Sequence, residues 1–326
     1  MSGYQKHSTG GEGPASLYSD ITRKIIAELE AGNVPWVQPW AGSGRGGAAV
    51  GMPANASTHR RYSGINILIL WNAVIKRGFA HQGWLTFRQA LSLGGCVRKG
   101  EHGTTVVYAD RFVPRTERQR LDAGGDDIRA IPFLKRFTVF NIAQCDGLPD
   151  DGTGLETVPD TPQIDPSVRN LIAKSGIDFR VGGDRAYYVP SHDYVQIPPP
   201  EAYFEPINWH RTALHELGHA SGHPSRLNRD LTGPFGSRKY AAEELVAEMT
   251  SAFCCASLGI MPTVRHSDYI ANWLEVLRED DKAIFRAASQ ASKSADYLLG
   301  FLKAEDESEA AAAAAAAAAR DDLAAA

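Results

Sequence analysis

His215-Glu216-Leu217-Gly218-His219 matches the pattern H-E-x-x-H, and it decides how the C-terminal half of this 326-residue sequence is interpreted. Two histidines four residues apart on a helix lie on one face, where a single Zn²⁺ can bind both imidazoles. The carboxylate of Glu216 between them can take a proton from a water on that metal, as hydrolysis of a peptide bond requires. Five residues also match by accident, so the surrounding sequence must decide.

The residues around the motif predict a helix. An apolar stripe with helical spacing accompanies the histidines and consists of Trp209, Ala213, Leu214, Leu217 and Ala220. Pro206 suits a first turn, and Gly222 followed by Pro224 predicts the end of the helix. Gly218 costs about 1 kcal/mol relative to Ala inside a helix. Its presence therefore predicts close packing at this point, for instance against a strand.

Two short strands are predicted just before this helix. Arg185–Val189 and Tyr194–Ile197 have strand-like composition and flank the turn Pro190-Ser191-His192-Asp193. An edge strand beside a metal-binding helix can hold an extended peptide by adding it to the sheet. The segment therefore predicts a binding place for a protein substrate.

A catalytic zinc site needs a third protein ligand and an open position for water. The metzincin pattern H-E-x-x-H-x-x-G-x-x-H is matched through Gly222, but its last position here is Ser225. His223 lies two residues earlier, which is early for the chain to turn back to the metal. It is an alternative ligand, and otherwise a histidine near a helix end.

Another candidate ligand lies in a helix predicted from Tyr240 to about Leu258. Glu244 and Glu248 are four residues apart and share a face of that helix. Their spacing resembles the E-x-x-x-D/E pattern of gluzincin peptidases, in which the first acid binds zinc and the second orients a histidine. The resemblance implies Glu244 as ligand and Glu248 as the orienting residue. Glu243 and Glu248 are alternative ligands, and a solvated helix face is the alternative for all three.

The composition is that of a globular protein. Hydrophobic residues make up 43% of the chain, enough for two cores of ordinary size. No stretch has the apolar length of a membrane span, and residues 1–14 lack the apolar segment of a secretory signal. We therefore expect a soluble, cytoplasmic protein with no membrane partner. No C-x-x-C spacing occurs, so free thiols are expected at Cys96, Cys145, Cys254 and Cys255.

The net charge of −4 conceals an asymmetry between the two halves. Residues 1–145 carry 18 Lys/Arg against 10 Asp/Glu, whereas residues 146–326 carry 16 against 28. Such a split suggests a polyanion partner for the basic half. The expected organisation is a disordered segment 1–15, a basic domain 16–145, a Pro- and Gly-rich linker 146–165, a metal-binding domain 166–303 and a low-complexity tail 304–326.

The basic half is predicted to be α+β, like the chain as a whole. Helices are predicted at residues 17–31, at 65–76 and from Trp84 onward, and strands at 97–100, 104–108 and 133–140. The charged, Gly-rich segment Pro114–Pro132 is predicted to be an exposed loop.

Aromatic and cationic residues alternate in this half. Single-strand binders combine them because cations contact phosphates while rings stack on unpaired bases. The candidate contacts are Trp36, Trp40, Arg60, Arg61, Tyr62, Trp84, Arg88, Arg98 and Lys99. The alternative is that the tryptophans belong to the core and the arginines to a solvated surface. There is no RNP, KH or zinc-finger signature.

A series of short motifs runs through the same half in order. It consists of Tyr18–Glu30 with Gly32-Asn-Val-Pro-Trp36, Pro39-Trp40, Arg61-Tyr62-Ser-Gly-Ile-Asn66, Leu70-Trp71, Trp84–Ala90, Gly94–Glu101, Val106–Tyr108 and Val139-Phe-Asn141. Together these motifs resemble the N-terminal domain of the ArdC-type antirestriction proteins, which TraC-type plasmid primases share. In the ArdC type a zincin-like metallopeptidase domain follows, at the place of His215–His219 and Glu243–Glu248. The resemblance covers about residues 16–303.

The resemblance implies an antirestriction protein of a plasmid, phage or other mobile element. It implies an N-terminal domain that binds single-stranded DNA, and a role in the escape of incoming DNA from host restriction during transfer. Conjugating DNA enters a recipient as a single strand, which agrees with the charge split. The segment Pro114–Pro132 is longer than the connection expected from the resemblance. The resemblance therefore implies nothing about whether that loop contacts DNA.

Two functions are consistent with these observations. In the first, the chain is a zinc metalloendopeptidase acting on an unidentified protein near bound DNA. Its predicted site consists of His215, His219 and Glu244 as Zn²⁺ ligands, Glu216 as general base, Glu248 behind the ligands, and Tyr240 or His210 at the oxyanion. In the second, the zinc site is structural or vestigial and the protein shields DNA by occupancy. Glu216 favours the first, because a purely structural site does not need a general base.

Overall fold

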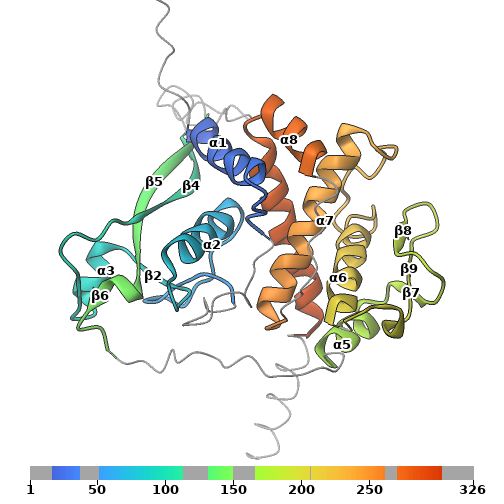
Figure 1. Ribbon diagram of the computed structural model, residues 1–326, viewed down its shortest axis with the longest axis horizontal. Coiled ribbons are helices and arrows are strands. Elements are labelled where there is room, and N and C mark those ends of the chain that lie inside the picture. Colours follow the sequence, from blue (N-terminus) through green and yellow to red (C-terminus); the bar gives the residue numbers. More distant parts are fainter. Residues whose placement is uncertain are drawn as a thin grey trace, which may run out of the picture.

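The computed structural model describes residues 17–36, 51–112, 131–149, 166–205, 207–260 and 270–302. Within them it is an α+β structure, with a sheet in each half and helices between and around the sheets (Figure 1). Several predictions fall outside the described residues and concern the segment 1–15, Trp40, the loop at 113–130, the linker at 150–165, Pro206 and the tail from 303.

The N-terminal half contains a four-stranded sheet with three helices. The helices are α1 (Leu17–Glu30), α2 (Ile65–Arg77) and α3 (Phe87–Ser92). The sheet has the order β1 (Ala54–Asn55), β2 (Gly83–Leu85), β5 (Ile131–Asn141) and β4 (Thr104–Phe112). A separate pair joins β3 (Cys96–Val97) to β6 (Cys145–Asp146), which follows the short helix η1 (Ile142–Gln144). The first two predicted helices are confirmed, each to within one residue at its end.

The third helix begins later than predicted. Trp84 and Leu85 belong to strand β2 and are fully buried in the sheet. The helix begins at Phe87 because Thr86 caps it, accepting a hydrogen bond from the backbone of Gln89 while the Gln89 side chain bonds back to Thr86. The capping box formed by Thr86 and Gln89 therefore defines the start of α3, and the apolar residue Trp84 does not.

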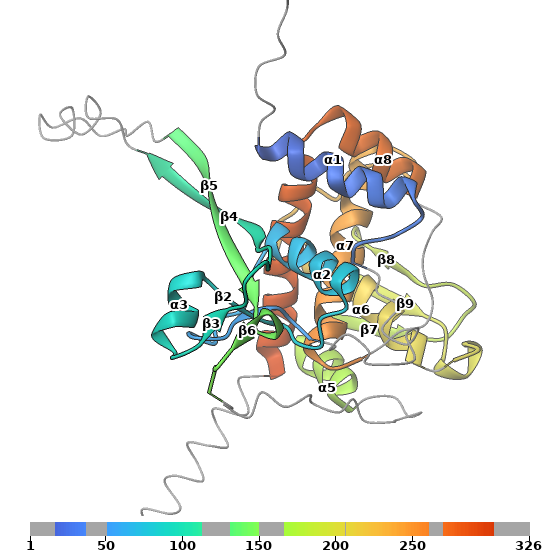
Figure 2. The ribbon, with the colours of Figure 1, turned by 60° about the vertical axis from the view of Figure 1, so that its left-hand side comes forward.

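Strands β4 and β5 form a long antiparallel hairpin that projects away from the body of the molecule (Figure 2). Their register runs from Thr104 opposite Val139 to Phe112 opposite Ile131. On α2, the side chain of Asn66 accepts a hydrogen bond from the backbone N–H of Val107 at 2.8 Å and donates one to its carbonyl at 2.7 Å. These two bonds fix α2 along the edge of β4.

The C-terminal half places a three-stranded sheet beside a group of helices. The helices are α5 (Pro166–Ser175), α6 (Ile207–Ser221), α7 (Arg238–Ser257), α8 (Ile270–Glu279) and a further helix over residues 283–302. The sheet has the order β7 (Asp178–Val181), β9 (Tyr194–Ile197) and β8 (Tyr187–Val189), with the short helix η2 (Pro200–Ala202) after it. The strands at 185–189 and 194–197 were predicted, whereas β7 was not.

Helices α6 and α7 pack at very short range, and Gly218 permits it. A Cβ atom at Gly218 would lie 3.3 Å from the Cα atom of Ala247 and from Cβ of Thr250. The glycine thus faces a helix, and the strand suggested from sequence is not its neighbour. A further bond joins the two helices where the Ser251 hydroxyl donates to the carbonyl of Arg211 at 2.8 Å.

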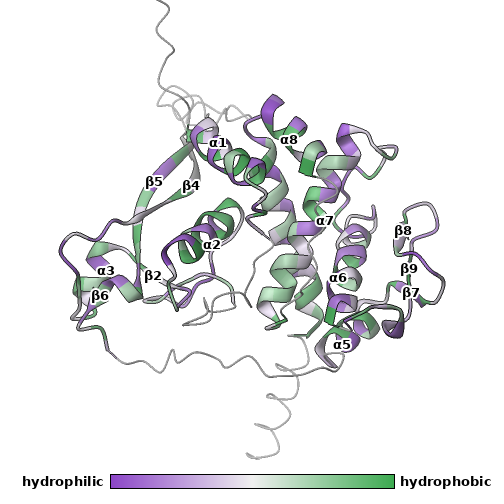
Figure 3. Ribbon diagram, viewed as in Figure 1, coloured by the Kyte–Doolittle hydropathy of each residue, from purple (hydrophilic) through white to green (hydrophobic). Residues whose placement is uncertain are grey.

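The main hydrophobic core is continuous across both halves of the chain. Trp71 on α2 packs edge to face on Phe253 of α7, with ring centroids 5.6 Å apart. Trp36 packs in the same way on Trp273 of α8 at 5.4 Å. Figure 3 shows α2 as a mainly hydrophobic helix, in keeping with its buried position. The sequence predicted two cores, but helices from both predicted domains contribute to this one.

Candidate metal centre

The side chains of His215, His219 and Glu244 converge where α6 packs on α7. The Nε2 atoms of the two histidines lie 3.2 Å apart. Glu244 places Oε2 3.4 Å from Nε2 of His215 and Oε1 3.3 Å from Nε2 of His219. Ligands about 2.0–2.1 Å from a tetrahedral zinc lie about 3.3 Å from one another. The triangle therefore fits one divalent ion bound by all three side chains.

The charges in this triangle are coupled through burial and close contact. Burial lowers the pKa of His219, but the carboxylates of Glu243 and Glu244 outweigh it and raise that pKa to about 10. Burial also lowers the pKa of His215, and here Glu244 and Glu248 reverse the direction. The pKa of Glu244 shows the converse: burial raises it, and the two histidines hold it well below its usual range.

A carboxylate lies behind each histidine, at the ring nitrogen turned away from the triangle. Nδ1 of His219 is 3.2 Å from Oε1 of Glu243. Nδ1 of His215 is 3.4 Å from Oε1 of Glu248. Partners of this kind fix the tautomer and orientation of metal-binding imidazoles. Glu243 and Glu248 thus face the histidines instead of the triangle, which leaves the ligand position to Glu244.

Two arginines, each with a side chain that is 5% exposed, hold these carboxylates in place. Arg229 donates from Nη2 to Oε1 of Glu243 at 2.6 Å and from Nε to Oε2 at 3.0 Å. Arg211 donates to Oε2 of Glu248 at 2.5 Å. Sequence reasoning missed both arginines. Arg211 lies one helical turn before His215, so its spacing offered a signal, whereas Arg229 follows the helix in a loop and offered none.

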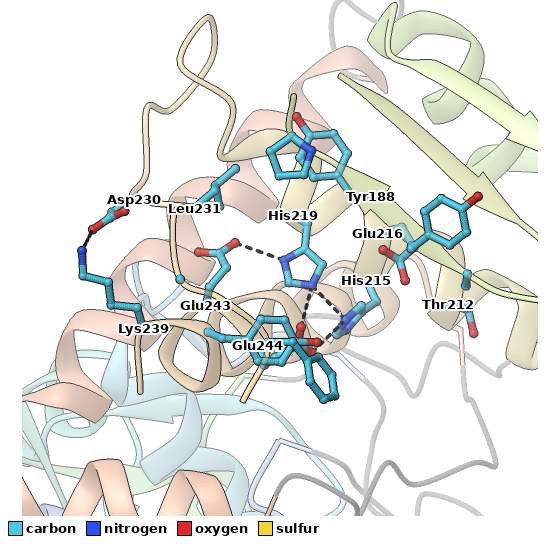
Figure 4. A pocket seen from close by; sticks show the side chains of 16 residues that line it. Tyr188, Thr212, His215, Glu216, His219, Asp230, Leu231, Lys239, Glu243 and Glu244 are labelled. Atoms are coloured by element: carbon cyan, nitrogen blue, oxygen red, sulfur yellow. Dashed lines mark hydrogen bonds and ion pairs between the residues drawn. The ribbon is translucent and has the colours of Figure 1, made fainter. Parts of the chain in front are cut away.

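A cavity of about 630 Å³ opens beside the triangle, between α6, β8 and the start of α7 (Figure 4). Besides the triangle and Glu243, it is lined by Ala186, Tyr187, Tyr188, Pro190, Thr212, Glu216, Asp230, Leu231, Gly233, Phe235, Lys239 and Tyr240. Glu216 is only 6% exposed, and Figure 4 shows it beside His215. A carboxylate placed there can exchange a proton with a group bound in the cavity.

Strand β8 forms one wall of this cavity. It is the last strand in the order β7-β9-β8, and its outer edge pairs with no strand among the described residues. Arg226 fixes it relative to α6, donating from Nη1 to Oδ2 of Asp193 at 3.1 Å and from Nε to the carbonyl of Ala220 at 2.7 Å. Asp193 in turn accepts a hydrogen bond from the Tyr188 hydroxyl at 2.8 Å. The edge strand is therefore tied to the helix that carries the histidines.

The remaining candidates of this half occupy different places. Tyr240 lines the cavity, and its ring centroid is 5.0 Å from that of Phe235. His210 does not line the cavity; it is fully buried, with Nδ1 3.2 Å from the carbonyl oxygen of Ile207. Only a side chain that reaches the cavity can stabilise an oxyanion there, so His210 is not positioned for that role. His223 lies outside the triangle, with Nδ1 2.7 Å from Oγ of Ser225.

The aromatic candidates for nucleic-acid contacts are mostly in the core. Trp36 and Trp84 are 2% and 0% exposed, and a buried ring cannot stack on a base, so neither is positioned for the predicted DNA contact. Tyr62 is half-buried, and burial raises its pKa. Trp40 lies outside the described residues.

The cationic candidates all reach the surface. Arg60, Arg88 and Lys99 are exposed. Arg61 is exposed as well and lies 3.4 Å from Oγ of Ser257 on α7. Arg98 forms ion pairs with Glu101 at 3.0 Å and with Asp146 at 3.2 Å, and these bonds raise its pKa. Of the candidate DNA contacts, the five cations are thus accessible at the surface, whereas the rings of Trp36 and Trp84 are not.

Comparison with known proteins agrees with this arrangement. Residues 15–140 match the family described as the N-terminal domain of anti-restriction factor ArdC. Residues 166–290 match the family described as zincin-like metallopeptidase. The crystal structure of the metal-free antirestriction ArdC protein from plasmid R388 is 38% identical, with a TM-score of 0.73, and the similarity covers 88% of this chain and 98% of that one. The chain belongs to the ArdC family of antirestriction proteins.

Three further relatives are similar to most of this chain. The Mn(II)-bound structure of the R388 ArdC protein is 37% identical, with a TM-score of 0.71 over 88% of this chain and 98% of that one. A Sinorhizobium fredii (strain NBRC 101917 / NGR234) protein, y4eC, is 42% identical over 87% of this chain and 92% of its own. DNA primase TraC of Escherichia coli is 39% identical over 87% of this chain, which spans only 27% of the primase. No helix in the described ranges is long and apolar enough to cross a membrane.

Proposed function

We propose that this ArdC-family protein is a zinc-dependent endopeptidase that acts close to single-stranded DNA held by its N-terminal half. The observation that carries the proposal is the triangle of His215, His219 and Glu244, with edges of 3.2–3.4 Å, beside Glu216 in a large cavity. We take residues 16–145 as the DNA-binding region and residues 166–303 as the peptidase region.

The chemistry follows from the residues around the cavity. A divalent ion held by the triangle would act as a Lewis acid that polarises a peptide carbonyl and acidifies the attacking water. The carboxylate of Glu216 accepts the proton of that water and delivers it to the leaving amine nitrogen. Tyr240, on the cavity wall, is the candidate donor to the oxyanion.

Strand β8 supports an extended peptide as the substrate. Its outer edge presents backbone N–H and C=O groups, and residues on either side of it line the cavity. A peptide that adds to this edge forms main-chain hydrogen bonds irrespective of its sequence, and its side chains fill the cavity.

The ligand set supports zinc as the metal. Two imidazoles and one carboxylate with an open fourth position are typical of catalytic zinc in peptidases. The relative with Mn(II) bound raises manganese as the competing ion. Elemental analysis of protein purified without added metal tests the choice: about one zinc per chain is expected, and manganese in its place contradicts the zinc assignment.

The basic half supports DNA as the partner. Over residues 51–112 and 131–145 it carries ten Lys/Arg against two Asp/Glu. We propose phosphate contacts by the exposed cations Arg60, Arg61, Arg88, Arg98 and Lys99, with Tyr62 beside them. The affinity for a single strand should fall with salt, with a log–log slope of about −0.7 for each phosphate neutralised. Equal affinity for duplex DNA, or no salt dependence, contradicts this part of the proposal.

The substitution Glu216→Gln tests the peptidase function directly. It preserves the shape of the side chain and removes the base, so cleavage of proteins in a recipient-cell lysate should stop while metal content and DNA affinity stay unchanged. Glu201→Gln, at an exposed position in η2, is the matched control and should behave as wild type. If the Glu216 variant still protects transferred DNA from restriction as well as wild type does, protection comes from occupancy of the strand and not from proteolysis.

A further inference from the structure

The β4–β5 hairpin carries two aromatic side chains on one face, in neighbouring positions. Residues directly opposite in an antiparallel pair point to the same side of the sheet. Tyr108 lies opposite Lys135, and Val106 lies opposite Phe137. The side chains of Tyr108, Phe137 and Lys135 therefore share a face, and the two rings are diagonal neighbours. Diagonal neighbours are about 7–8 Å apart, close enough for two rings to form one continuous surface.

These rings are exposed, unlike most large apolar side chains of this half. Tyr108 is 57% exposed and Phe137 is 46% exposed. Val106, on the same face, is 5% exposed and packs in a small core with Leu70 and Val74 of α2. On this face α2 thus covers Val106, while the rings of Tyr108 and Phe137 are open to solvent. The opposite face bears Val107, which belongs to the main core, and Arg136, whose Nη2 atom is 3.4 Å from Oδ2 of Asp20 on α1.

The positive charge around this face indicates which class of partner binds it. Lys135 is exposed beside the rings, and the surrounding half of the chain has an excess of eight cations over residues 51–112 and 131–145. A protein partner with an apolar surface would pair with the rings but would leave the cations without counter-charges. A single strand of nucleic acid supplies phosphates for the cations and unpaired bases for the rings.

We infer that Tyr108, Phe137 and Lys135 form the surface on which bases of single-stranded DNA stack. The inference rests on the DNA-binding function proposed above and names the residues that give it a preference for single strands. The rings provide stacking platforms for two successive bases, and Lys135 contacts the backbone between or beside them. Trp36 and Trp84 support the structure from the core instead.

Substitution of the rings by threonine tests the inference. Threonine removes the aromatic surface and keeps the preference for a strand. In fluorescence anisotropy with an oligothymidine probe, Tyr108→Thr and Phe137→Thr should each weaken binding about tenfold or more. Tyr108→Phe and Phe137→Tyr keep a ring and should bind like wild type. Phe204→Ala removes a fully exposed ring in the other half and is the control.

An abasic probe separates stacking from a general loss of affinity. Wild type should bind an abasic strand much more weakly than oligothymidine, whereas the double threonine variant should bind the two probes alike. Lys135→Gln should reduce the salt slope by about 0.7 with either probe.

The outcomes distinguish this inference from the function on which it rests. If wild type fails to bind single-stranded DNA, the proposed function itself is wrong. If wild type binds and the threonine variants bind equally well, only the assignment of this surface is wrong. A change in sedimentation behaviour of the variants with unchanged DNA affinity would identify the face as a protein interface and overturn the inference.

Discussion

Oε1 of Glu243 lies 3.2 Å from Nδ1 of His219, while Nε2 of the same ring lies 3.3 Å from Glu244. Two consecutive carboxylates of α7 thus contact opposite nitrogens of one imidazole, and only one of them can share a metal with it. Arg229 holds the other at two oxygens. Of these neighbouring glutamates, Glu243 therefore orients the imidazole, and Glu244 is the one that can bind a metal together with it.

Glu243→Gln should weaken metal binding about 10–100-fold, which is the usual effect of losing a group that orients a metal ligand. The amide keeps the shape of the side chain but no longer attracts the proton on Nδ1 of His219. The dissociation constant can be measured by competition with a chromogenic chelator. Glu244→Gln should cost more, because it removes a ligand, and Glu201→Gln should cost nothing. Equal losses for Glu243→Gln and Glu244→Gln would show that both acids bind the metal.

Gly218→Ala should destabilise the protein although alanine is the better helix former. The added Cβ would stand 3.3 Å from the Cα atom of Ala247, so α6 and α7 must separate slightly. We expect a net loss of about 1–3 kcal/mol in the free energy of unfolding, with weaker metal binding because the same helix pair spaces the ligands. Gly300→Ala, in the helix over 283–302, meets no atom within 4 Å and is the control. It should gain up to about 1 kcal/mol in a denaturant titration. A gain at both glycines contradicts the packing argument.

Asp193 predicts a specific dependence of stability on pH. Burial raises the pKa of its carboxyl group, but the Arg226 guanidinium and the Tyr188 hydroxyl outweigh this and hold the pKa below its usual range. Because the pKa is lower in the folded state, the ion pair stabilises the protein at neutral pH, and the contribution is lost as pH falls from about 4 through the depressed value.

Asp193→Asn should therefore lower Tm at neutral pH, and its difference from wild type should shrink in this acidic range. Asparagine tolerates the positive φ of 50° at this position, so the exchange adds no backbone strain. Thermal melts at a series of pH values measure the difference. Asp178→Asn, which breaks an exposed pair with Arg180, should have little effect at any pH. A constant gap between Asp193→Asn and wild type at all pH values would contradict the argument.

The sequence predicted the helix of the motif, its two histidines and the glutamate that converges with them, because each depends on local spacing. His215, Glu216 and His219 fall within five residues, and Glu244 with Glu248 repeats the same four-residue interval. A helix converts such intervals into a shared face without help from the rest of the chain.

The burial of aromatic residues was not predictable in the same way. Trp36 and Tyr108 occur among similar cations, yet one packs on Trp273 and the other faces solvent. Stacking surfaces and hydrophobic cores use the same aromatic side chains, so composition does not separate an exposed ring from a buried one. The exposed position of Tyr108 follows from the register of β4 on β5, which the sequence alone does not reveal. The ion pair between Arg229 and Glu243 was not predictable from local spacing, because the packing of α7 brings the two residues together.

The continuous core predicts that the two halves unfold together. Phe253 of α7 is fully buried and packs on Trp71 of α2, so Phe253→Ala removes a contact between the C-terminal and the N-terminal halves. A loss of about 3–5 kcal/mol in the free energy of unfolding is expected. Hydrogen exchange locates it: α2 and α6 should lose slow-exchange protection by the same factor, because both are protected by one cooperative unit. Phe204→Ala, at a fully exposed ring, should leave both unchanged. Loss of protection in α6 with α2 unaffected would show instead that the halves are independent domains in contact.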